Sequence, residues 1–303
     1  VALVNEISAF ENRGGNMGVY NSLRLVGFGA GPLVAGGVME GGPYPVPGLA
    51  EVTLSGFDAT FYLAAFAALL SAVLVQIFVE DPEETMPTRE RLALRVRSAS
   101  PERILDPIFA LGIVTFVMSA CIALLAPIEP SVNERLGQGP FLFAVEFSAL
   151  IAALAVVQPL VGSASDRVGR RTFIVVGLIG LVPGTLLQGL VTTPWQMVGA
   201  RLLQGVSAAA VFAPALALAG DLSREGQSGA QLSVLTMAFG LGISFGQISA
   251  GYLIRFGFAT PFAFGALLAA GTVLLVRSQV PEPSDAEAKK KEAPASGATG
   301  AAG

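Results

Sequence analysis

Long apolar stretches separated by short polar turns run along most of the chain. An α-helix needs about 20 apolar residues to cross the roughly 30 Å hydrocarbon core of a bilayer. Eight stretches meet this requirement, at residues 18–39, 57–79, 106–128, 140–161, 172–191, 194–220, 229–253 and 258–279. The pattern therefore predicts an all-α polytopic membrane protein with eight transmembrane helices.

Composition supports a membrane protein and excludes several other classes. Apolar residues make up 53% of the chain and charged residues only 13%, against about 25% charged residues in a typical soluble domain. The net charge of −4, without a basic face, argues against nucleic-acid binding. There is no histidine, and the single cysteine, Cys121, lies within an apolar stretch. We therefore expect no metal site, no cofactor and no enzymatic activity.

The distribution of basic residues predicts how the chain is oriented. If residues 1–17 are cytoplasmic, the inner side carries fourteen basic residues and the outer side only Arg135 and Arg255. Basic residues are retained on the cytoplasmic side of membrane proteins. The C-terminal tail, residues 281–303, is then cytoplasmic, and its low content of aliphatic residues predicts disorder.

One short segment between two predicted helices contains a dense group of charges and glycines. It has the form Gly-x-x-x-Asp-Arg-x-Gly-Arg-Arg, made of Gly162, Asp166, Arg167, Gly169, Arg170 and Arg171. Three arginines in so short a segment indicate a cytoplasmic turn. Glycine at both ends permits a tight turn and a close approach of the two helices.

This segment closely resembles the signature loop of the major facilitator superfamily of secondary transporters. The resemblance implies two parallel six-helix halves and transport by rocking-bundle alternating access. It also implies that Asp221, at the end of the helix two spans later, pairs with Arg170 and latches one state of the cycle. The alternative is that these charges only set the topology. No Gly-x-x-x-x-Gly-Lys-Ser/Thr loop is present, so ATP is not expected to drive the protein.

An internal repeat predicts the domain organisation. Gly18 and the sequence Phe28-Gly29-Ala30-Gly31 align with Gly229 and Phe239-Gly240-Leu241-Gly242 at a constant offset of 211 residues. We therefore expect residues 1–79 to be the last two helices of an N-terminal half and residues 80–105 to be a cytoplasmic linker. Residues 106–280 would then be a complete six-helix C-terminal half. By this interpretation about a hundred residues and four of twelve helices would precede Val1, so the chain would be truncated at its N-terminus.

Two further patterns resemble those of proton-coupled drug exporters in the same superfamily. Gly27, Gly31, Pro32 and Gly36 follow the pattern Gly-x-x-x-Gly-Pro-x-x-Gly-Gly, with Ala35 in place of the first glycine of the final pair. Glycines on one helix face allow close packing, and an internal proline bends the helix. Residues 201–205, Arg-Leu-Leu-Gln-Gly, resemble a pattern known from the fourth helix, although here it lies in the predicted tenth.

Four polar residues within the predicted spans are candidates for coupling. Arg201 and Glu146 lie about seven and six residues into their spans from the outer side, at a similar depth. An arginine at that depth is costly unless it is paired, hydrated or extended toward the interface. A Glu146–Arg201 pair would act as a static clamp or as a protonation switch. Gln204 and Gln247 are expected to face a cavity.

These observations combine into one functional hypothesis. We expect a multi-pass transporter of the cell membrane that exports a small organic compound by alternating access, with protons as the coupling ion. Its partners would be the lipid bilayer and the small-molecule substrate. The alternative is an eight-helix remnant, or a membrane protein that binds a partner, without transport of its own.

Overall fold

The computed structural model describes residues 13–45, 53–79, 96–98, 103–222 and 228–281. Within these residues nearly all regular structure is helical, apart from a two-stranded antiparallel hairpin of β1 (Tyr44–Pro45) and β2 (Thr53–Leu54). The long helices are α2 (Arg13–Gly41), α3 (Gly56–Phe78), α4 (Pro107–Ala123), α6 (Pro140–Val168), α7 (Arg170–Leu186), α8 (Pro194–Asp221), α9 (Ser228–Leu253) and α10 (Thr260–Gln279). A short helix, α5 (Glu129–Leu136), and three 3₁₀ turns, η1 (Ala126–Ile128), η2 (Leu187–Gly189) and η3 (Ile254–Phe256), complete the order.

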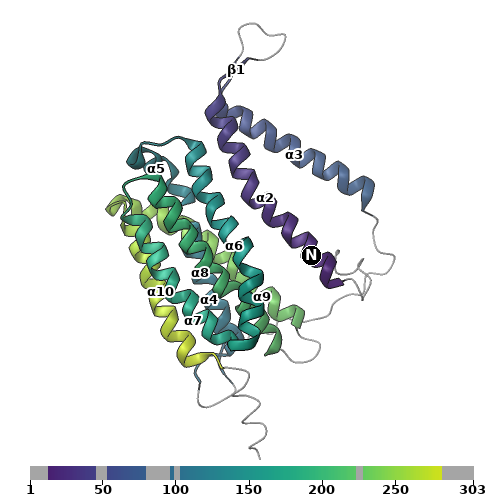
Figure 1. Cartoon of the computed structure of the whole chain (residues 1–303), viewed down its shortest axis with the longest axis vertical. Helices are drawn as coiled ribbons and strands as arrows, with labels where there is room; N and C mark the ends of the chain where they lie inside the picture. Colours follow the sequence, from purple (N-terminus) through teal and green to yellow (C-terminus); the bar gives the residue numbers. More distant parts are fainter. Residues whose placement is uncertain (1–12, 46–52, 80–95, 99–102, 223–227, 282–303) are drawn as a thin grey trace, which may run out of the picture.

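The eight predicted spans each correspond to one long helix in the described residues. Seven helical segments there are long and apolar enough to cross a membrane. The remaining helix, α2, is rich in glycine and contains Arg24 and Glu40, which lower its mean hydropathy. The fold is therefore the predicted all-α polytopic arrangement (Figure 1). Most of the linker 80–105 and all but one residue of the tail 281–303 lie outside the described residues.

Local signals in the sequence explain where several helices begin. Proline occupies the first turn of α4, α6 and α8, where its missing N–H costs no hydrogen bond. Asp106 caps α4, because its Oδ1 accepts a hydrogen bond from the Ile108 N–H at 2.9 Å. Ser55 caps α3 in the same way, accepting from the Asp58 N–H at 3.1 Å.

The charged segment at residues 162–171 is more helical than predicted. Helix α6 continues to Val168 and α7 begins at Arg170, so the turn consists of Gly169 alone. Gly169 has φ of 116°, a conformation that residues with a side chain rarely adopt. Gly162 lies within α6 and has no atom within 4 Å of where a Cβ would be. Of the two glycines, only Gly169 makes the turn.

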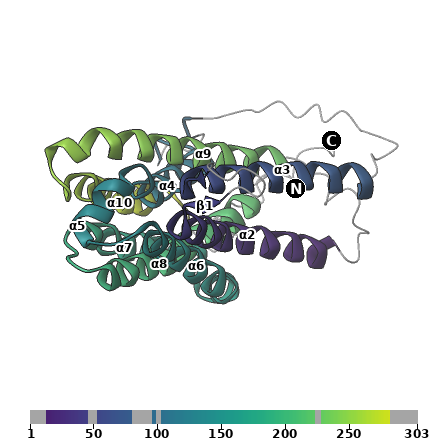
Figure 2. The same ribbon diagram turned by 90° about the horizontal axis from the view of Figure 1, so that it is seen from above.

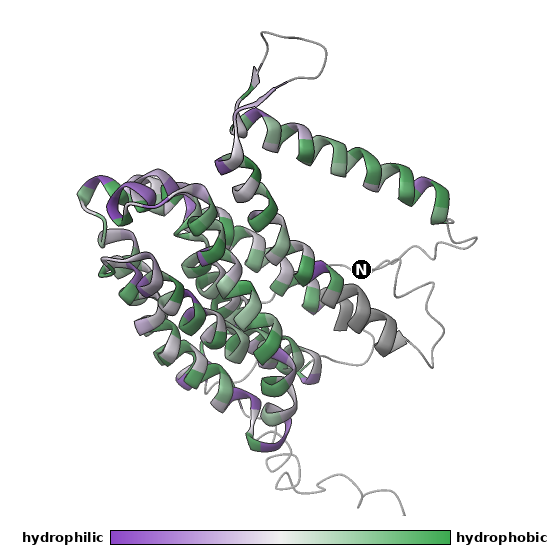
Figure 3. Cartoon of the chain, turned by 45° about the horizontal axis from the view of Figure 1, so that its top comes forward, coloured by the Kyte–Doolittle hydropathy of each residue, from purple (hydrophilic) through white to green (hydrophobic). Residues whose placement is uncertain are grey.

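Helices α4 and α6–α10 form a bundle around two clusters of buried apolar residues. Helix α4 lies near its centre and packs against α8, α9 and α10, and Leu111, Val114 and Met118 on α4 are almost completely buried. Seen from above, α9 lies along one edge of the bundle and α6, α7 and α8 lie along the opposite edge (Figure 2). Helix α10 packs on both α7 and α4. Apolar residues cover the helix bodies and polar residues gather near the ends of the bundle (Figure 3).

Helices α2 and α3 lie at the edge of this bundle. Helix α2 packs on α6, and α3 meets α2 at its own beginning, where Thr60 donates to the Ala35 carbonyl at 3.3 Å. From residue 61 to residue 78 every residue of α3 is exposed. An apolar helix exposed over these eighteen residues requires a lipid or protein environment around it.

Candidate functional site

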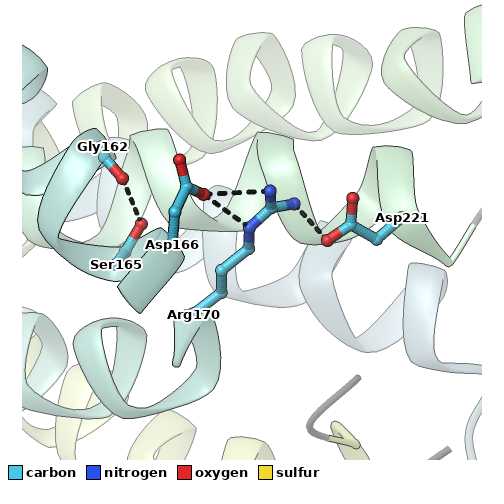
Figure 4. Close-up of polar contacts among 5 residues, drawn as sticks. All are labelled: Gly162, Ser165, Asp166, Arg170 and Asp221. Carbon is cyan, nitrogen blue, oxygen red and sulfur yellow. Dashed lines mark hydrogen bonds and ion pairs between the residues drawn. The ribbon is translucent and has the colours of Figure 1, made fainter. Parts of the chain in front are cut away.

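A cluster of charges joins the ends of three helices. Arg170, the first residue of α7, donates from Nε and Nη2 to Asp166 Oδ1 at 3.2 and 3.0 Å. Its Nη1 forms an ion pair with Asp221 Oδ2, at the end of α8. Figure 4 shows the guanidinium between the two carboxylates. The Arg170–Asp221 pair implied by the family resemblance is thus present, and Asp166 forms a second pair with the same arginine.

The single-residue turn at Gly169 determines this geometry. Because the turn is so short, the last turn of α6 and the first residue of α7 are adjacent, and Asp166 reaches Arg170 four residues later. Ser165 donates to the Gly162 carbonyl at 2.8 Å and stays within α6 (Figure 4). The side chain of Arg170 is 20% exposed, that of Asp166 58% and that of Asp221 43%. The pairs are therefore partly hydrated and individually weak.

The same end of the bundle contains a second set of contacts. Arg171 Nη2 donates to the backbone carbonyl of Arg277, in the last turn of α10, at 2.5 Å. Gln279 Oε1, at the end of α10, accepts the N–H groups of Ile104 and Leu105 at 2.9 and 3.0 Å. Gln279 thus binds the end of the linker to α10. Sequence reasoning missed Gln279, because no local pattern indicates a contact across about 175 residues. Arg167 is exposed in the same segment.

A buried polar network lies near the opposite end of the bundle. Arg201 on α8 is completely buried and donates from Nη1 to Gln204 Oε1 at 2.7 Å and to the Ile122 carbonyl at 3.3 Å. Gln204 Nε2 in turn donates to the Cys121 carbonyl at 3.0 Å and to Thr185 Oγ1 at 3.2 Å. The network connects α8 to α4 and α7. The expectation that Gln204 faces a cavity is wrong, because its amide links helices in the interior.

Glu146 on α6 is the acidic member of this region. It is completely buried, and it interacts electrostatically with Arg201. Among the described residues, however, no ion pair joins the two groups, and neither Glu146 oxygen nor Arg201 Nε and Nη2 has a hydrogen-bond partner. Glu146 and Arg201 are therefore neighbours that interact electrostatically, without the direct ion pair that was predicted. Gln247, the other coupling candidate, is exposed on α9.

The glycine pattern of α2 contacts α6 at only some of its positions. A Cβ on Gly36 would lie 2.8 Å from the Ala144 Cβ and 3.0 Å from the Pro140 carbonyl oxygen, so only glycine fits there. Gly27 and Gly31 have no atom within 4 Å of a Cβ position. Pro32 lies inside α2 as predicted.

Comparison with known proteins now identifies the family. Residues 111–301 match the Major Facilitator Superfamily, which is more than half of the chain. The chain belongs to the Major Facilitator Superfamily. Superfamily members are membrane transporters rather than enzymes, in agreement with the sequence analysis. Like them, the chain is a multi-pass membrane protein.

Several curated relatives are drug-resistance proteins. The chain is 34% identical to the puromycin resistance protein pur8 of Streptomyces alboniger over 128 residues, or 42% of this chain and 25% of that protein. It is 29% identical to multidrug resistance protein 2 of Bacillus subtilis over 164 residues, or 53% and 41%. It is 33% identical to the class B tetracycline resistance protein of Escherichia coli over 112 residues, or 37% and 28%. The chain thus spans at most about two fifths of these relatives.

Proposed function

We propose that the protein is a secondary active transporter of the cell membrane that exports a small organic compound in exchange for protons. Three of its relatives are named for resistance to puromycin, to tetracycline or to multiple drugs. Their names support a substrate of the same class, a small and partly apolar organic molecule. ATP is not required, because alternating access can be driven by an ion gradient.

The observation that carries this proposal is the arginine shared between two carboxylates at the helix ends. Arg170 binds Asp166 on α6 and Asp221 on α8 at once. Partly exposed ion pairs contribute only about 0–1 kcal/mol each. Such a contact is too weak to determine the fold, yet it is strong enough to bias two nearly equal conformations. We infer that it holds this end of the bundle in one state of the transport cycle.

The repeat supports the arrangement of the two halves. We propose that α4 to α10 form one six-helix half and that α2 and α3 belong to its counterpart. Gly31 and Gly242, which are 211 residues apart, both lie on long helices, α2 and α9. The contact between α2 and α6 would then be a contact between the two halves. We also propose the orientation given by the basic residues, with the Arg170 end and the C-terminus in the cytoplasm.

Proton coupling is assigned to Glu146. Its carboxyl group is buried within the membrane-spanning part and has no hydrogen bond from the described residues. The neighbouring Arg201 supplies a positive charge that compensates the carboxylate when its proton has left. The amide of Gln138 and the charge of Arg201 are its polar neighbours. A carboxyl group without an ion pair at contact distance can exchange a proton when one conformation hydrates it, which favours a protonation switch over a static clamp.

The test is proton-coupled transport in everted membrane vesicles. Addition of puromycin, tetracycline or ethidium should release protons from vesicles that contain the full chain, as followed with a pH-sensitive dye. Arg170→Ala should reduce the rate about five- to tenfold at an unchanged membrane level, because one contact of about 1 kcal/mol shifts an equilibrium about fivefold.

Arg277→Ala is the matched control, because it removes an exposed arginine from the same end of the bundle. It should leave the rate unchanged. Equal rates for Arg170→Ala and the parent would refute the latch. Absence of proton release from a correctly inserted parent, with every compound, would refute transport and favour a membrane protein that binds a partner.

A further inference from the structure

Helices α2 and α6 are antiparallel and touch along only part of their length. Ser148 Oγ on α6 donates to the Gly29 carbonyl on α2 at 2.6 Å, and Gly36 packs against Ala144. The closest of these contacts is at Gly36, near the end of α2, whereas a Cβ on Gly29 would meet only Ile151, at 3.5 Å. Figures 1 and 2 both show the beginning of α2 diverging from the bundle. The two helices therefore meet at the end of α2 and separate toward its beginning.

Glu40 lies at the closed end of this contact. Its Oε2 accepts a hydrogen bond from the Phe141 N–H, in the first turn of α6, at 3.2 Å. A Cβ on Gly139 would lie 3.2 Å from the same oxygen, so the absence of a side chain there permits the approach. Gly139 itself provides no side-chain cap for α6. Glu40 therefore supplies, from another helix, the negative group that a helix N-terminus favours.

We infer that Glu40 is a gating residue that latches α2 to α6 at the end of the bundle opposite Arg170. The carboxylate both accepts a backbone N–H of α6 and compensates the positive end of its dipole. Glu40 is exposed, so water can replace the Phe141 N–H when the helices part. The latch is reversible for the same reason that the Arg170 pairs are reversible.

This inference rests on the proposed alternating-access function, because opening of this end requires α2 to leave α6. Ala144 reports on the opening, since it is 4% exposed and covered by Gly36. A cysteine at position 144 should react slowly with a hydrophilic maleimide while the ends are closed. The natural Cys121 is buried and provides a low background.

The experiment measures the labelling rate of Ala144→Cys in the full chain, purified and reconstituted in nanodiscs. Glu40→Ala should increase the rate about fivefold, the effect expected when one charged hydrogen bond at a partly hydrated site is lost. Glu40→Gln, which retains an acceptor oxygen but not the charge, should give a smaller increase. Glu134→Ala, at an exposed acid on α5, should leave the rate unchanged.

An unchanged rate in Glu40→Ala, or an equal increase in Glu134→Ala, would overturn the latch. If Glu40→Ala does not reach the membrane in a folded form, the comparison of Glu40→Gln with the parent decides. The readout is accessibility rather than transport, so the two proposals can fail separately. Faster labelling without transport would leave the latch in place, whereas transport with unchanged labelling would refute it.

Discussion

Replacement of Arg201 by methionine tests whether the buried polar network is energetically coupled. The side chain of methionine has a similar length and no charge, so the change removes the donor and keeps most of the packing volume. It deletes the hydrogen bonds from Nη1 to Gln204 Oε1 and to the Ile122 carbonyl. It also leaves the buried Glu146 without its nearby positive charge.

The expected loss of stability follows from these contacts. A hydrogen bond from a charged donor contributes about 1.5–3 kcal/mol, and the unpaired buried acceptor on Gln204 adds a desolvation cost. The change also removes Arg201 Nε and Nη2, which have no hydrogen-bond partner among the described residues, and this offsets part of the loss. We expect Arg201→Met to lower the free energy of unfolding by about 2–4 kcal/mol.

Glu146→Gln completes a double-mutant cycle. Neither oxygen of Glu146 has a hydrogen-bond partner in the described structure, so this change acts mainly through charge and should cost only about 1–2 kcal/mol. If the two charges stabilise each other, the double variant should cost about 1–2 kcal/mol less than the sum of the single variants. Additivity within about 0.5 kcal/mol would refute the coupling.

The chain offers a natural probe for this measurement. Cys121 is the single cysteine of the sequence, and it is 1% exposed. Its carbonyl accepts a hydrogen bond from Gln204, and its thiol donates to the Gly265 carbonyl of α10 at 3.4 Å. The thiol therefore becomes accessible when α4, α8 and α10 separate on unfolding. Reaction with a thiol-reactive dye during unfolding in mixed detergent micelles gives the required free energies. Arg255→Met is the control; Arg255 is exposed against Tyr252, and its loss should cost less than about 1 kcal/mol.

Two further predictions concern packing and the linker. Gly246→Leu should lower the free energy of unfolding by about 1–3 kcal/mol in the same assay, because a Cβ there would clash with the Ala120 carbonyl of α4. Gly251→Leu is the control and should have no such effect, because no atom lies within 4 Å of a Cβ position there. Gln279→Leu should accelerate hydrogen–deuterium exchange of the amides at residues 104–105 about tenfold, because it removes their shared acceptor. Exchange at the parent rate would show that the linker is held by other contacts.

The sequence was sufficient to predict the helices but not all of their boundaries. The length of the hydrophobic stretches alone located the eight long helices. An unsatisfied backbone N–H or C=O group is costly in lipid, so an apolar segment that crosses a membrane folds as a helix, which satisfies these groups internally. It missed α5 and the continuation of α6 through the charged segment to Val168. Polar residues in that segment indicate a departure from the membrane core, and this signal does not distinguish a loop from a helix that extends into water.

The candidate site was predicted where local spacing or the family resemblance indicates a contact, as for Arg170 and Asp221, and it was missed elsewhere. The spacing of four residues between Asp166 and Arg170 is a local signal, and it produced the observed ion pair. The glycines of α2 were predicted to pack, but only the structure distinguishes Gly36, which contacts α6, from the open Gly31. Helix packing depends on which neighbour is present, and a single helix sequence does not contain that information.

Three acids on the long helices of the described structure lie where the helix dipole opposes them. Glu40 and Asp221 are in the last turns of α2 and α8, and Asp166 is in the last turn of α6. A negative charge near a helix C-terminus costs about 0.3–1 kcal/mol. A contact with another helix offsets this cost for each acid. Asp166 and Asp221 pair with Arg170, and Glu40 accepts a hydrogen bond at the beginning of α6. A contact whose gain is nearly balanced by such a cost can open with little energy, which is the property that the two proposed latches need. An acid in the last turn of a long helix is therefore a sequence signal for a partner on another helix.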